Sequence, residues 1–503
     1  LKKNRKASRG ITLYADDKTL HDKISLKSES FEENIKRVKK ALKNNKYINI
    51  GISRFNFFKI HEIIRFCYTL MGRRLDLRSV SLPLFPTKKL YYNFIDYLQE
   101  LTSRIGSKKI RFFLKDEKLL DLLYSISKQA DQYNERELLR LLGVISEHPF
   151  IGPQTIVLDT YHNCNTNCLH CWIHTPRRKL SPALNSLKMD FSLYKNIIDN
   201  AAELLCDEVI IQGDGEPLLD KRFPEMVQYA RDKGLKVLFF TNAILLDKRI
   251  ARRIIDLEID EIFCSLPAGT EATYARINPR QSKQTFRKIT KNLKDFISMR
   301  DKSGKKKPWL QMTHVIHNLN YHEVEEMAKL DTYIGADKVR FYLVRLDKNI
   351  NFLKLKSSHI HSIKESVKNI APFLKKKHIE LQDNICFQLK NYSTSTGHWS
   401  ASKLLKSCPV GWFFSLVLAK GEVSMCCHLR VIDILKEKSF KDIWNSSAYN
   451  KFRIKAKYLM DNKNTTFSND VKLYNEFCKH CDTHQVILRI NELFDKYKLT
   501  QFL

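Results

Sequence analysis

The chain has 503 residues, of which 43% are hydrophobic and 28% charged, a composition typical of folded globular proteins of two to four domains. No apolar run is long enough to span a bilayer, which excludes a protein built on membrane-spanning helices. The net charge of +32 is spread along the chain rather than gathered in one arm. A general preference for lysine therefore explains the charge best, and RNA or a membrane surface is the alternative partner.

Twelve cysteines are too many for thiols that only fill a core, and seven of them occur in closely spaced groups. Because nothing indicates secretion, we expect these thiols to bind metal in a reducing, cytoplasmic compartment rather than to form disulfides. Cys67 and Cys206 lie on the apolar faces of predicted helices and are interpreted as core residues.

Residues 1–115 are predicted to form an α/β segment that resembles a later part of the same chain. Three matching features occur in the same order in both parts. Ile11–Leu13 corresponds to Cys264–Leu266, Asn56 to Asn320, and Gly72 to Gly335. This order favours a degenerate half of a βα barrel without a cysteine cluster of its own. The alternative is that any two βα stretches look this similar. Residues 116–150 are helical and polar, which indicates a linker.

Residues 151–372 are predicted to form a larger α/β domain, because short apolar strands alternate there with amphipathic helices. The predicted strands are Thr155–Thr160, Glu208–Gln212, Lys236–Phe240, Glu261–Ser265, Leu310–Ile316 and Lys338–Leu343. The predicted helices include Leu193–Leu205, Asp247–Leu257, capped by the carboxylate of Asp247, and Gln284–Ile297. Six βα units in series require parallel pairing, so we expect a partial (β/α)6 barrel of the TIM type. Chemistry gathers at the carboxyl ends of such strands.

Three cysteines follow the first of these strands directly, in the segment Cys164-Asn-Thr-Asn-Cys168-Leu-His-Cys171. This C-x3-C-x2-C spacing allows one loop to hold three corners of a [4Fe–4S] cluster and to leave one iron open. Zinc fits less well, because it usually takes four ligands and often pairs two C-x2-C groups. The open iron is the functional point, since a cofactor can coordinate there.

This loop resembles the cluster-binding loop of the radical S-adenosylmethionine (radical SAM) superfamily, and the resemblance covers residues 151–345. It implies that the amino and carboxylate groups of S-adenosylmethionine chelate the open iron. A low-potential electron then breaks a carbon–sulfur bond, which yields methionine and a 5′-deoxyadenosyl radical. The resemblance therefore implies a [4Fe–4S] cluster and S-adenosylmethionine as cofactors.

Further motifs of the same family end the next three strands. Gly213-Asp214-Gly215-Glu216-Pro217 looks like its glycine-rich Glu-Pro loop, in which glycine allows a close approach to the cofactor and Glu216 accepts from the methionine ammonium. Thr241-Asn242-Ala243 stands where the family has Thr-Asn-Gly, and Ser265 where it often has a ribose-contacting serine. The implied cofactor-binding residues are Gly213, Gly215, Glu216, Thr241, Asn242 and Ser265. His170 and Ala243 depart from the family pattern.

Residues 373–503 are predicted to form a separate small domain that ends in a helix at Gln485–Tyr497. Its cysteine order, Cys408, then Gly421-x4-Cys426, then Cys478-Lys-His-Cys481, resembles the auxiliary-cluster extension called SPASM. No cysteine follows Cys481, as in the shortened "twitch" form. The resemblance implies one auxiliary [4Fe–4S] cluster held by Cys408, Cys426, Cys478 and Cys481.

Two alternatives remain open for this second site. Cys427 is the alternative to Cys426, because neighbouring strand residues point in opposite directions. A zinc site of four thiolates is the alternative to iron, since the spacing fits both metals. A complete ligand set suits electron transfer, and His428 and His480 are expected to tune the potential through hydrogen bonds to sulfur.

The resemblance to SPASM and twitch enzymes implies abstraction of a hydrogen atom from an unactivated carbon. A peptide or protein is the substrate ranked first, a small molecule such as a sugar or cofactor precursor second, and RNA third. An electron donor such as flavodoxin or ferredoxin is the expected partner. The alternative of another class is a non-catalytic metal-binding module that binds nucleic acid. The sequence identifies neither the substrate nor a catalytic acid or base.

Overall fold

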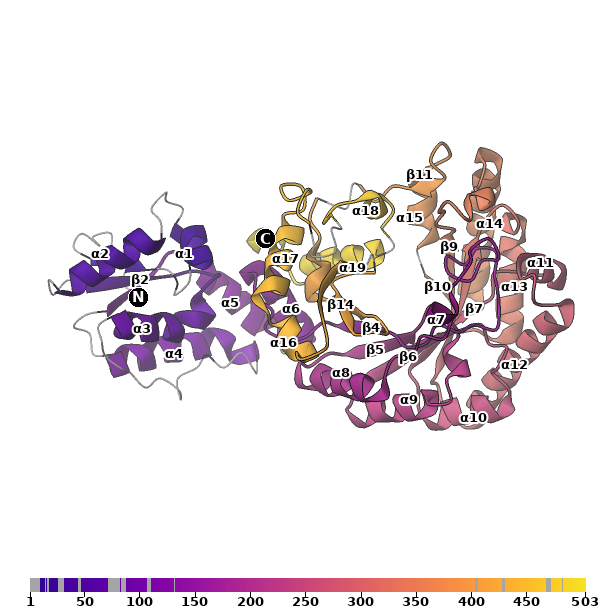
Figure 1. Cartoon of the computed structure of the whole chain (residues 1–503), viewed down its shortest axis with the longest axis horizontal. Helices are drawn as coiled ribbons and strands as arrows, with labels where there is room; N and C mark the ends of the chain where they lie inside the picture. Colours follow the sequence, from indigo (N-terminus) through magenta and orange to yellow (C-terminus); the bar gives the residue numbers. More distant parts are fainter. Residues whose placement is uncertain are drawn as a thin grey trace. The chain divides into compact units, whose positions relative to one another are not determined.

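The computed structural model contains two compact units, residues 152–489 and residues 1–151 together with 490–503 (Figure 1). Each unit is treated by itself. No helix in the described part of the chain has the length and apolar character needed to cross a membrane. The described residues are 10–13, 15, 18–25, 31–43, 47–70, 82, 87–105, 110–130, 132–382, 384–402, 406–427, 430–466, 472–481 and 483–503.

A ten-stranded sheet forms the centre of the larger unit, in the order β10-β9-β8-β7-β6-β5-β4-β13-β14-β15. Its six core strands run parallel and match the predicted ones: β4 Thr155–Asp159, β5 Glu208–Gln212, β6 Lys236–Thr241, β7 Glu261–Ser265, β8 Trp309–Ile316 and β9 Lys338–Leu343. Among the described strands, β10 (Glu380–Gln382) and β15 (Val431–Ile434) end the sheet, so it is open. The prediction of an α/β fold with a partial barrel is confirmed.

Amphipathic helices connect these strands and cover one side of the sheet (Figure 1). They are α8 Phe191–Glu203, α9 Phe223–Asp232, α10 Lys248–Asp256, α12 Lys283–Lys302, α13 Val324–Ile334 and α14 Ser357–Lys376. The carboxylate of Asp247 accepts from the backbone N–H of Ile250 at 2.9 Å, which confirms the predicted N-cap of α10. Cys206 is buried in the apolar core between the helices and the sheet, as predicted.

The C-terminal segment extends the same sheet. Strand β13 (Phe414–Val417) runs parallel to β4, with Phe414 opposite Thr155 and Val417 opposite Leu158. Strand β14 (Glu422–Ser424) then returns antiparallel to β13. All four residues of β13 are buried, because this strand has neighbours on both of its edges. The segment predicted to be a separate domain thus shares a sheet with the core.

The smaller unit is built on a three-stranded parallel sheet of β1 (Gly10–Leu13), β2 (Tyr47–Ile52) and β3 (Ile110–Leu114). Its helices are α1 Lys18–Ser25, α2 Phe31–Lys43, α3 Ile60–Leu70, α4 Leu90–Ile105, α5 Lys118–Gln129 and α6 Glu135–Ser146. Cys67 is buried in it, as predicted. The segment predicted as a linker contains α5 and α6, which pack into this unit. Residues 490–503, which include the second half of α19 (His484–Lys496), also belong to it.

The asparagine turn of the predicted repeat is present in both units. After β2, the Asn56 side chain accepts from Ser53 N–H at 2.7 Å and donates to the Gly51 carbonyl at 2.8 Å. After β8, Asn320 makes the same two bonds to residues three and five positions before it, at 2.7 and 2.9 Å. Both asparagines have φ −137°, and each precedes a short 3-10 turn and an 11-residue helix. Gly72 lies outside the described residues.

The first prediction concerns this turn. Replacing Asn56 by alanine leaves a buried N–H and a buried carbonyl without this partner, so we expect the smaller unit to lose about 1–3 kcal/mol of unfolding free energy. Hydrogen exchange of the β2 and α3 amides in the full chain measures this loss. Asn369→Ala is the control, because that exposed side chain bonds only to Glu325 on the surface. Unchanged protection in Asn56→Ala would contradict the structural role of the turn.

Candidate functional site

Three thiols gather in the loop that leaves the carboxyl end of β4. The hydroxyl of Thr166 lies 3.3 Å from Cys164 Sγ and 3.5 Å from Cys168 Sγ. The backbone N–H of His174 donates to Cys171 Sγ at 3.2 Å, and the chain turns tightly between Cys168 and Cys171 through a backbone hydrogen bond of 3.0 Å. A single short loop therefore presents all three sulfur atoms.

The electrostatics of this loop favour a bound cation. Burial, together with the negative charges of neighbouring thiolates, raises the pKa of Cys168 to about 12 and that of Cys171 to about 11. Burial also raises the pKa of Cys164. The thiolates repel one another and need positive charge beside them, which iron supplies when it replaces the protons. The donor set thus fits a cluster held at three corners.

Glu216 lies buried at the end of the next strand, with 2% of its surface exposed. Its carboxylate accepts from the hydroxyl of Thr241 at 2.8 Å and from the backbone N–H of Asn242 at 2.7 Å. Burial raises the pKa of this carboxyl to about 7, although these hydrogen bonds oppose the shift. A buried carboxyl with so few charged neighbours is suited to hold a cationic ligand group.

The Thr241-Asn242-Ala243 segment joins the ends of β5 and β6 to the cysteine loop. The Asn242 side chain donates to Asn165 Oδ1, inside the cysteine loop, at 2.7 Å. Ala243 has φ +56°, in the left-handed region where glycine is favoured. The turn that glycine makes in the resembling family is therefore kept here with alanine, at a cost in backbone strain of about 1–2 kcal/mol.

Gly213 and Gly215 are required by close packing of the chain, and their predicted approach to the cofactor stays a prediction. A Cβ atom on Gly213 would lie 2.1 Å from the carbonyl oxygen of Tyr161, and one on Gly215 would lie 2.2 Å from that of Asn163. The two glycines thus allow the β5 loop to pack directly against the backbone that enters the cysteine loop. Ser265 lies half-buried at the end of β7, on the same edge of the sheet.

Two histidines, His170 half-buried and His317 fully buried, lie beside the cysteine loop, and sequence reasoning singled out only the first. The rings of His170 and His317 stack with their centroids 5.5 Å apart. Burial lowers the pKa of His170 to about 4 and lowers that of His317 well below its usual value, so both rings are neutral. His170 Nδ1 and His317 Nε2 are buried without a hydrogen-bond partner. These two atoms are available to a polar ligand.

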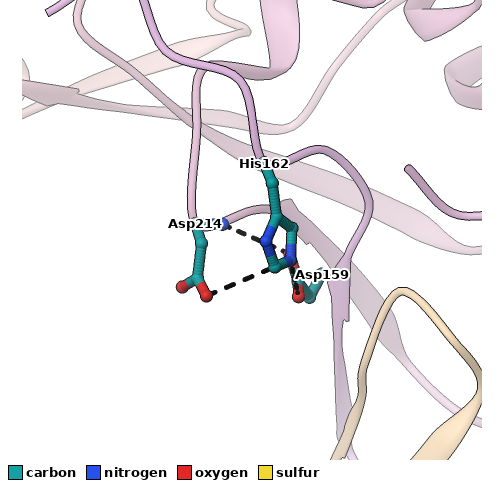
Figure 2. A group of neighbouring side chains, drawn as sticks. All are labelled: Asp159, His162 and Asp214. Atoms are coloured by element: carbon teal, nitrogen blue, oxygen red, sulfur yellow. Dashed lines mark hydrogen bonds and ion pairs between the residues drawn. The ribbon is translucent and has the colours of Figure 1, made fainter. Parts of the chain in front are cut away.

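A second group missed in the sequence links β4 to the loop after β5. Figure 2 shows the ring of His162 between the carboxylates of Asp159 and Asp214. His162 Nε2 lies 2.7 Å from Asp159 Oδ2 and 4.0 Å from Asp214 Oδ2, and Asp214 N–H donates to Asp159 at 3.2 Å. The signal was a polar residue at a strand end and a histidine just before Cys164.

This group could offer three ligand atoms within 4.8 Å of one another. Burial by itself lowers the pKa of His162, but the hydrogen bond and charge of Asp159 outweigh it and the net pKa is raised. Burial and the Asp159 charge raise the pKa of Asp214 to about 6. His162 Nδ1 is buried without a hydrogen-bond partner, while the bonds to Asp159 hold the cysteine loop and the glycine loop together.

The second cysteine set lies near the start of β13 and the end of β14. Cys408 precedes β13, Cys426 follows β14, Cys478 lies in α18 (Glu476–Lys479), and Cys481 follows it. Burial raises the pKa of Cys408 to about 12, and the charges of Cys426 and Cys478 raise it further, which places these three thiols close together. Cys481 is buried in the adjoining core.

Cys427 faces a different neighbour. Its sulfur lies 2.9 Å from the hydroxyl of Thr483. His480 directs Nδ1 to the carbonyl of Trp399 at 2.7 Å, and its ring stacks on His398 at 4.1 Å. His428 lies outside the described residues. A charged side chain that the sequence did not single out, Arg430, also contacts a cysteine sulfur here, since its Nη2 lies 2.9 Å from Cys478 Sγ.

Comparison with known families agrees with both cysteine sets. The model of the Radical SAM superfamily matches residues 158–330. The model described as an iron–sulfur cluster-binding domain matches residues 408–482. The first match contains Cys164, Cys168 and Cys171, and the second begins at Cys408 and ends just after Cys481.

Characterised proteins match over most of their own length. The tungsten-containing aldehyde ferredoxin oxidoreductase cofactor-modifying protein of Pyrococcus furiosus is 22% identical over 60% of this chain and 83% of its own. The PqqA peptide cyclase of Xanthomonas campestris pv. campestris is 23% identical over 60% of this chain and 76% of its own. Among solved structures, Streptococcus suis SuiB bound to S-adenosylmethionine aligns with a TM-score of 0.49 and 14% identity, over 79% of this chain and 87% of that one.

The second prediction separates Cys426 from Cys427. In a full-length chain that carries alanine at Cys164, Cys168 and Cys171, only the second site can hold iron, and we expect about four irons per chain. Adding Cys426→Ala should reduce this to almost none, whereas adding Cys427→Ala should leave it unchanged, because Cys427 faces Thr483. Iron assay and absorption after anaerobic reconstitution measure both. The reverse pattern would assign the ligand to Cys427, and bound zinc instead of iron would contradict the cluster.

Proposed function

Because the chain is a radical SAM enzyme whose core is followed by an iron–sulfur cluster-binding domain, we propose that it oxidises or crosslinks a peptide or protein side chain. In this proposal Cys164, Cys168 and Cys171 hold the cluster that binds S-adenosylmethionine. Cys408, Cys426, Cys478 and Cys481 hold an auxiliary [4Fe–4S] cluster that receives an electron from the substrate.

The observation that carries the proposal is the pairing of β4 with β13, because each strand leads to one of the two cysteine sets. The first set follows Asp159, at the carboxyl end of β4. Ser424 of β14 pairs with Leu416 of β13, and Leu416 pairs with Val157 of β4. Because β14 runs antiparallel to β13, it leads back toward Thr155, at the start of β4, before the chain reaches Cys426. Thr155 and Asp159 are four strand positions, or about 13 Å, apart. The two sets therefore lie toward opposite ends of one strand pair, which suits separate roles in cofactor binding and electron transfer rather than a shared substrate atom.

When bound, S-adenosylmethionine and the two clusters would supply radical chemistry that removes one hydrogen atom, one further electron and one proton from the substrate. A donor of the flavodoxin or ferredoxin class would supply the electron for cleavage to methionine and 5′-deoxyadenosine, the electron that leaves the substrate would pass to the auxiliary site, and the substrate would be oxidised by two electrons. Glu216 accepts from the ammonium group of the cofactor. His170, which is half-buried, and His317, which is buried, are both neutral and line the same edge.

A peptide or protein substrate is favoured by the similarity to a peptide cyclase that spans three quarters of that protein. A small-molecule substrate is the second candidate, since a cofactor-modifying protein matches to a similar extent. Turnover with candidate peptides, followed by mass spectrometry, tests the choice. A peptide that loses two hydrogens supports the first candidate, and turnover only on small molecules supports the second.

The third prediction concerns Glu216 and pH. The pKa of its carboxyl is raised to about 7, so the group is mostly ionised at pH 8 and mostly protonated at pH 6. Only the carboxylate attracts the ammonium of S-adenosylmethionine, so affinity should fall about tenfold between these two pH values. Calorimetric titration of reconstituted protein without reductant measures the Kd.

Glu216→Gln should bind the cofactor weakly and with no such pH dependence. Glu208→Gln is the matched control, because Glu208 lies at the opposite end of β5 and bonds to the Thr155 hydroxyl. It should keep the fall in affinity. A pH dependence that survives in Glu216→Gln would assign the ammonium contact to another residue.

The fourth prediction separates the two clusters. Cys168→Ala should abolish formation of 5′-deoxyadenosine with a strong reductant, because the SAM-binding cluster loses one of its three ligands. Cys478→Ala should keep that cleavage but lose the oxidised product. Chromatography of 5′-deoxyadenosine and mass spectrometry of the substrate measure both activities. Cys386→Ala is the control, since this exposed thiol lies in neither set.

Two outcomes would contradict the assignment. Cleavage retained by Cys168→Ala would show that the loop after β4 does not hold the essential cluster. Normal product from Cys478→Ala would remove the electron-accepting role from the second set while leaving the first intact.

A further inference from the structure

We propose that Arg430 raises the reduction potential of the auxiliary cluster and thereby makes it able to accept an electron from the substrate radical. This inference rests on the electron-accepting role proposed above. It concerns a buried guanidinium that contacts one ligand sulfur directly and lies across a hairpin from another ligand.

Arg430 lies at the start of the strand that pairs with β14. Val431, the first residue of β15, lies opposite Ser424, and the Arg430 carbonyl accepts from the N–H of Met425 at 3.3 Å. The backbone of Arg430 is therefore opposite the residue that precedes Cys426. Its side chain is directed toward the other arm of the site, where Nη2 donates to Cys478 Sγ at 2.9 Å and to the Leu473 carbonyl at 3.3 Å.

The side chain is 1% exposed, so water screens its charge very little. The guanidinium contacts Cys478 Sγ directly, and the backbone of the same residue pairs with Met425, the neighbour of Cys426. Arg430 thus joins both arms of the ligand set.

A cluster with four thiolate ligands carries negative charge, and reduction adds one more electron to it. A buried cation beside the sulfur atoms stabilises the reduced state more than the oxidised state, because the interaction grows with the negative charge. An N–H donor to a ligand sulfur acts in the same direction, since hydrogen bonds to sulfur are among the factors that set cluster potentials. Both effects raise the potential.

Two other side chains of the same region that can carry a positive charge, Arg453 and His480, make their contacts elsewhere. Arg453 is also fully buried, but its guanidinium stacks on Trp444 and Tyr449 at 3.9 Å and donates to the carbonyl oxygens of Gly411 and Trp444. The His480 ring is held by Trp399 and His398. Arg430 is therefore the charged side chain that the described part of the domain directs at a ligand sulfur.

The test is a redox titration of the auxiliary cluster followed by electron paramagnetic resonance. It uses the full-length chain with alanine at Cys164, Cys168 and Cys171, so that one cluster gives the signal. Arg430→Gln removes the charge and should lower the midpoint potential by at least about 59 mV, a tenfold shift of a one-electron equilibrium. Arg430→Lys keeps the charge and should remain within half of that shift. Lys451→Gln, an exposed lysine of α17 (Ser447–Lys457), makes the same charge change in solvent and should have almost no effect.

An unchanged potential in Arg430→Gln would overturn the inference, and so would an equal shift in Lys451→Gln. If Arg430→Gln does not hold iron, Arg430→Lys decides. A near-native potential there supports the role of charge, whereas loss of the cluster or a tenfold shift shows that the guanidinium acts through its shape. The readout needs no substrate, so it is independent of the test with Cys478→Ala. Product formation that does not need Cys478 would refute the proposed function but would leave the measured potential unaffected.

Discussion

Strand β4 has a parallel neighbour on each of its edges, and the rest of the site depends on this arrangement. Strand β5 on one edge brings the loop with Glu216 to the cysteine loop, and β13 on the other edge brings the second cysteine set into the same sheet. Parallel strands align their carboxyl ends, so the loops after β4, β5 and β6 meet at one edge. The second set is held at the other end of the same strand pair. One sheet thus positions two metal sites without a flexible connection between them.

The cofactor edge is held together mainly by direct contact between backbones. The two glycines of the β5 loop leave no room for a Cβ against the carbonyls of Tyr161 and Asn163. The Asn242–Asn165 hydrogen bond then fixes the β6 loop to the cysteine loop. These contacts fix the three thiols and the buried Glu216 carboxylate on one edge of the sheet, as the proposed function requires. The hydrogen bond between Asp159 and His162 adds a further polar contact beside the same loops.

Local patterns in the sequence predicted much of this. Six strands, the cap at Asp247 and both cysteine sets follow from periodicity and spacing, since each lies within a few residues of its own signal. The features that could not be predicted depend on contacts between distant parts of the chain. The pairing of β13 with β4 joins residues about 260 positions apart, and the apolar run of β13 by itself does not name its neighbour. Among 87 lysines and arginines, nothing local marks Arg430 as the one buried against a sulfur. The close packing of the two glycines against the backbone of the cysteine loop is likewise a contact between distant segments that no local pattern predicts.

The asparagine turn occurs in both units, but the side chain that it presents differs between them. In the larger unit the turn at Asn320 presents His317, whose buried Nε2 faces the cofactor edge without a protein partner. In the smaller unit the same turn presents Ser53, whose hydroxyl bonds back to Asn56 at 3.2 Å. The turn geometry is the same in both because the asparagine satisfies backbone groups, which every βα unit of this type requires. The side chain that the turn presents is free to differ, and only one of the two copies has a cysteine loop beside it. The smaller unit thus shares the asparagine turn and parallel βα pairing with the larger one, and its relation to half of a βα barrel stays a prediction.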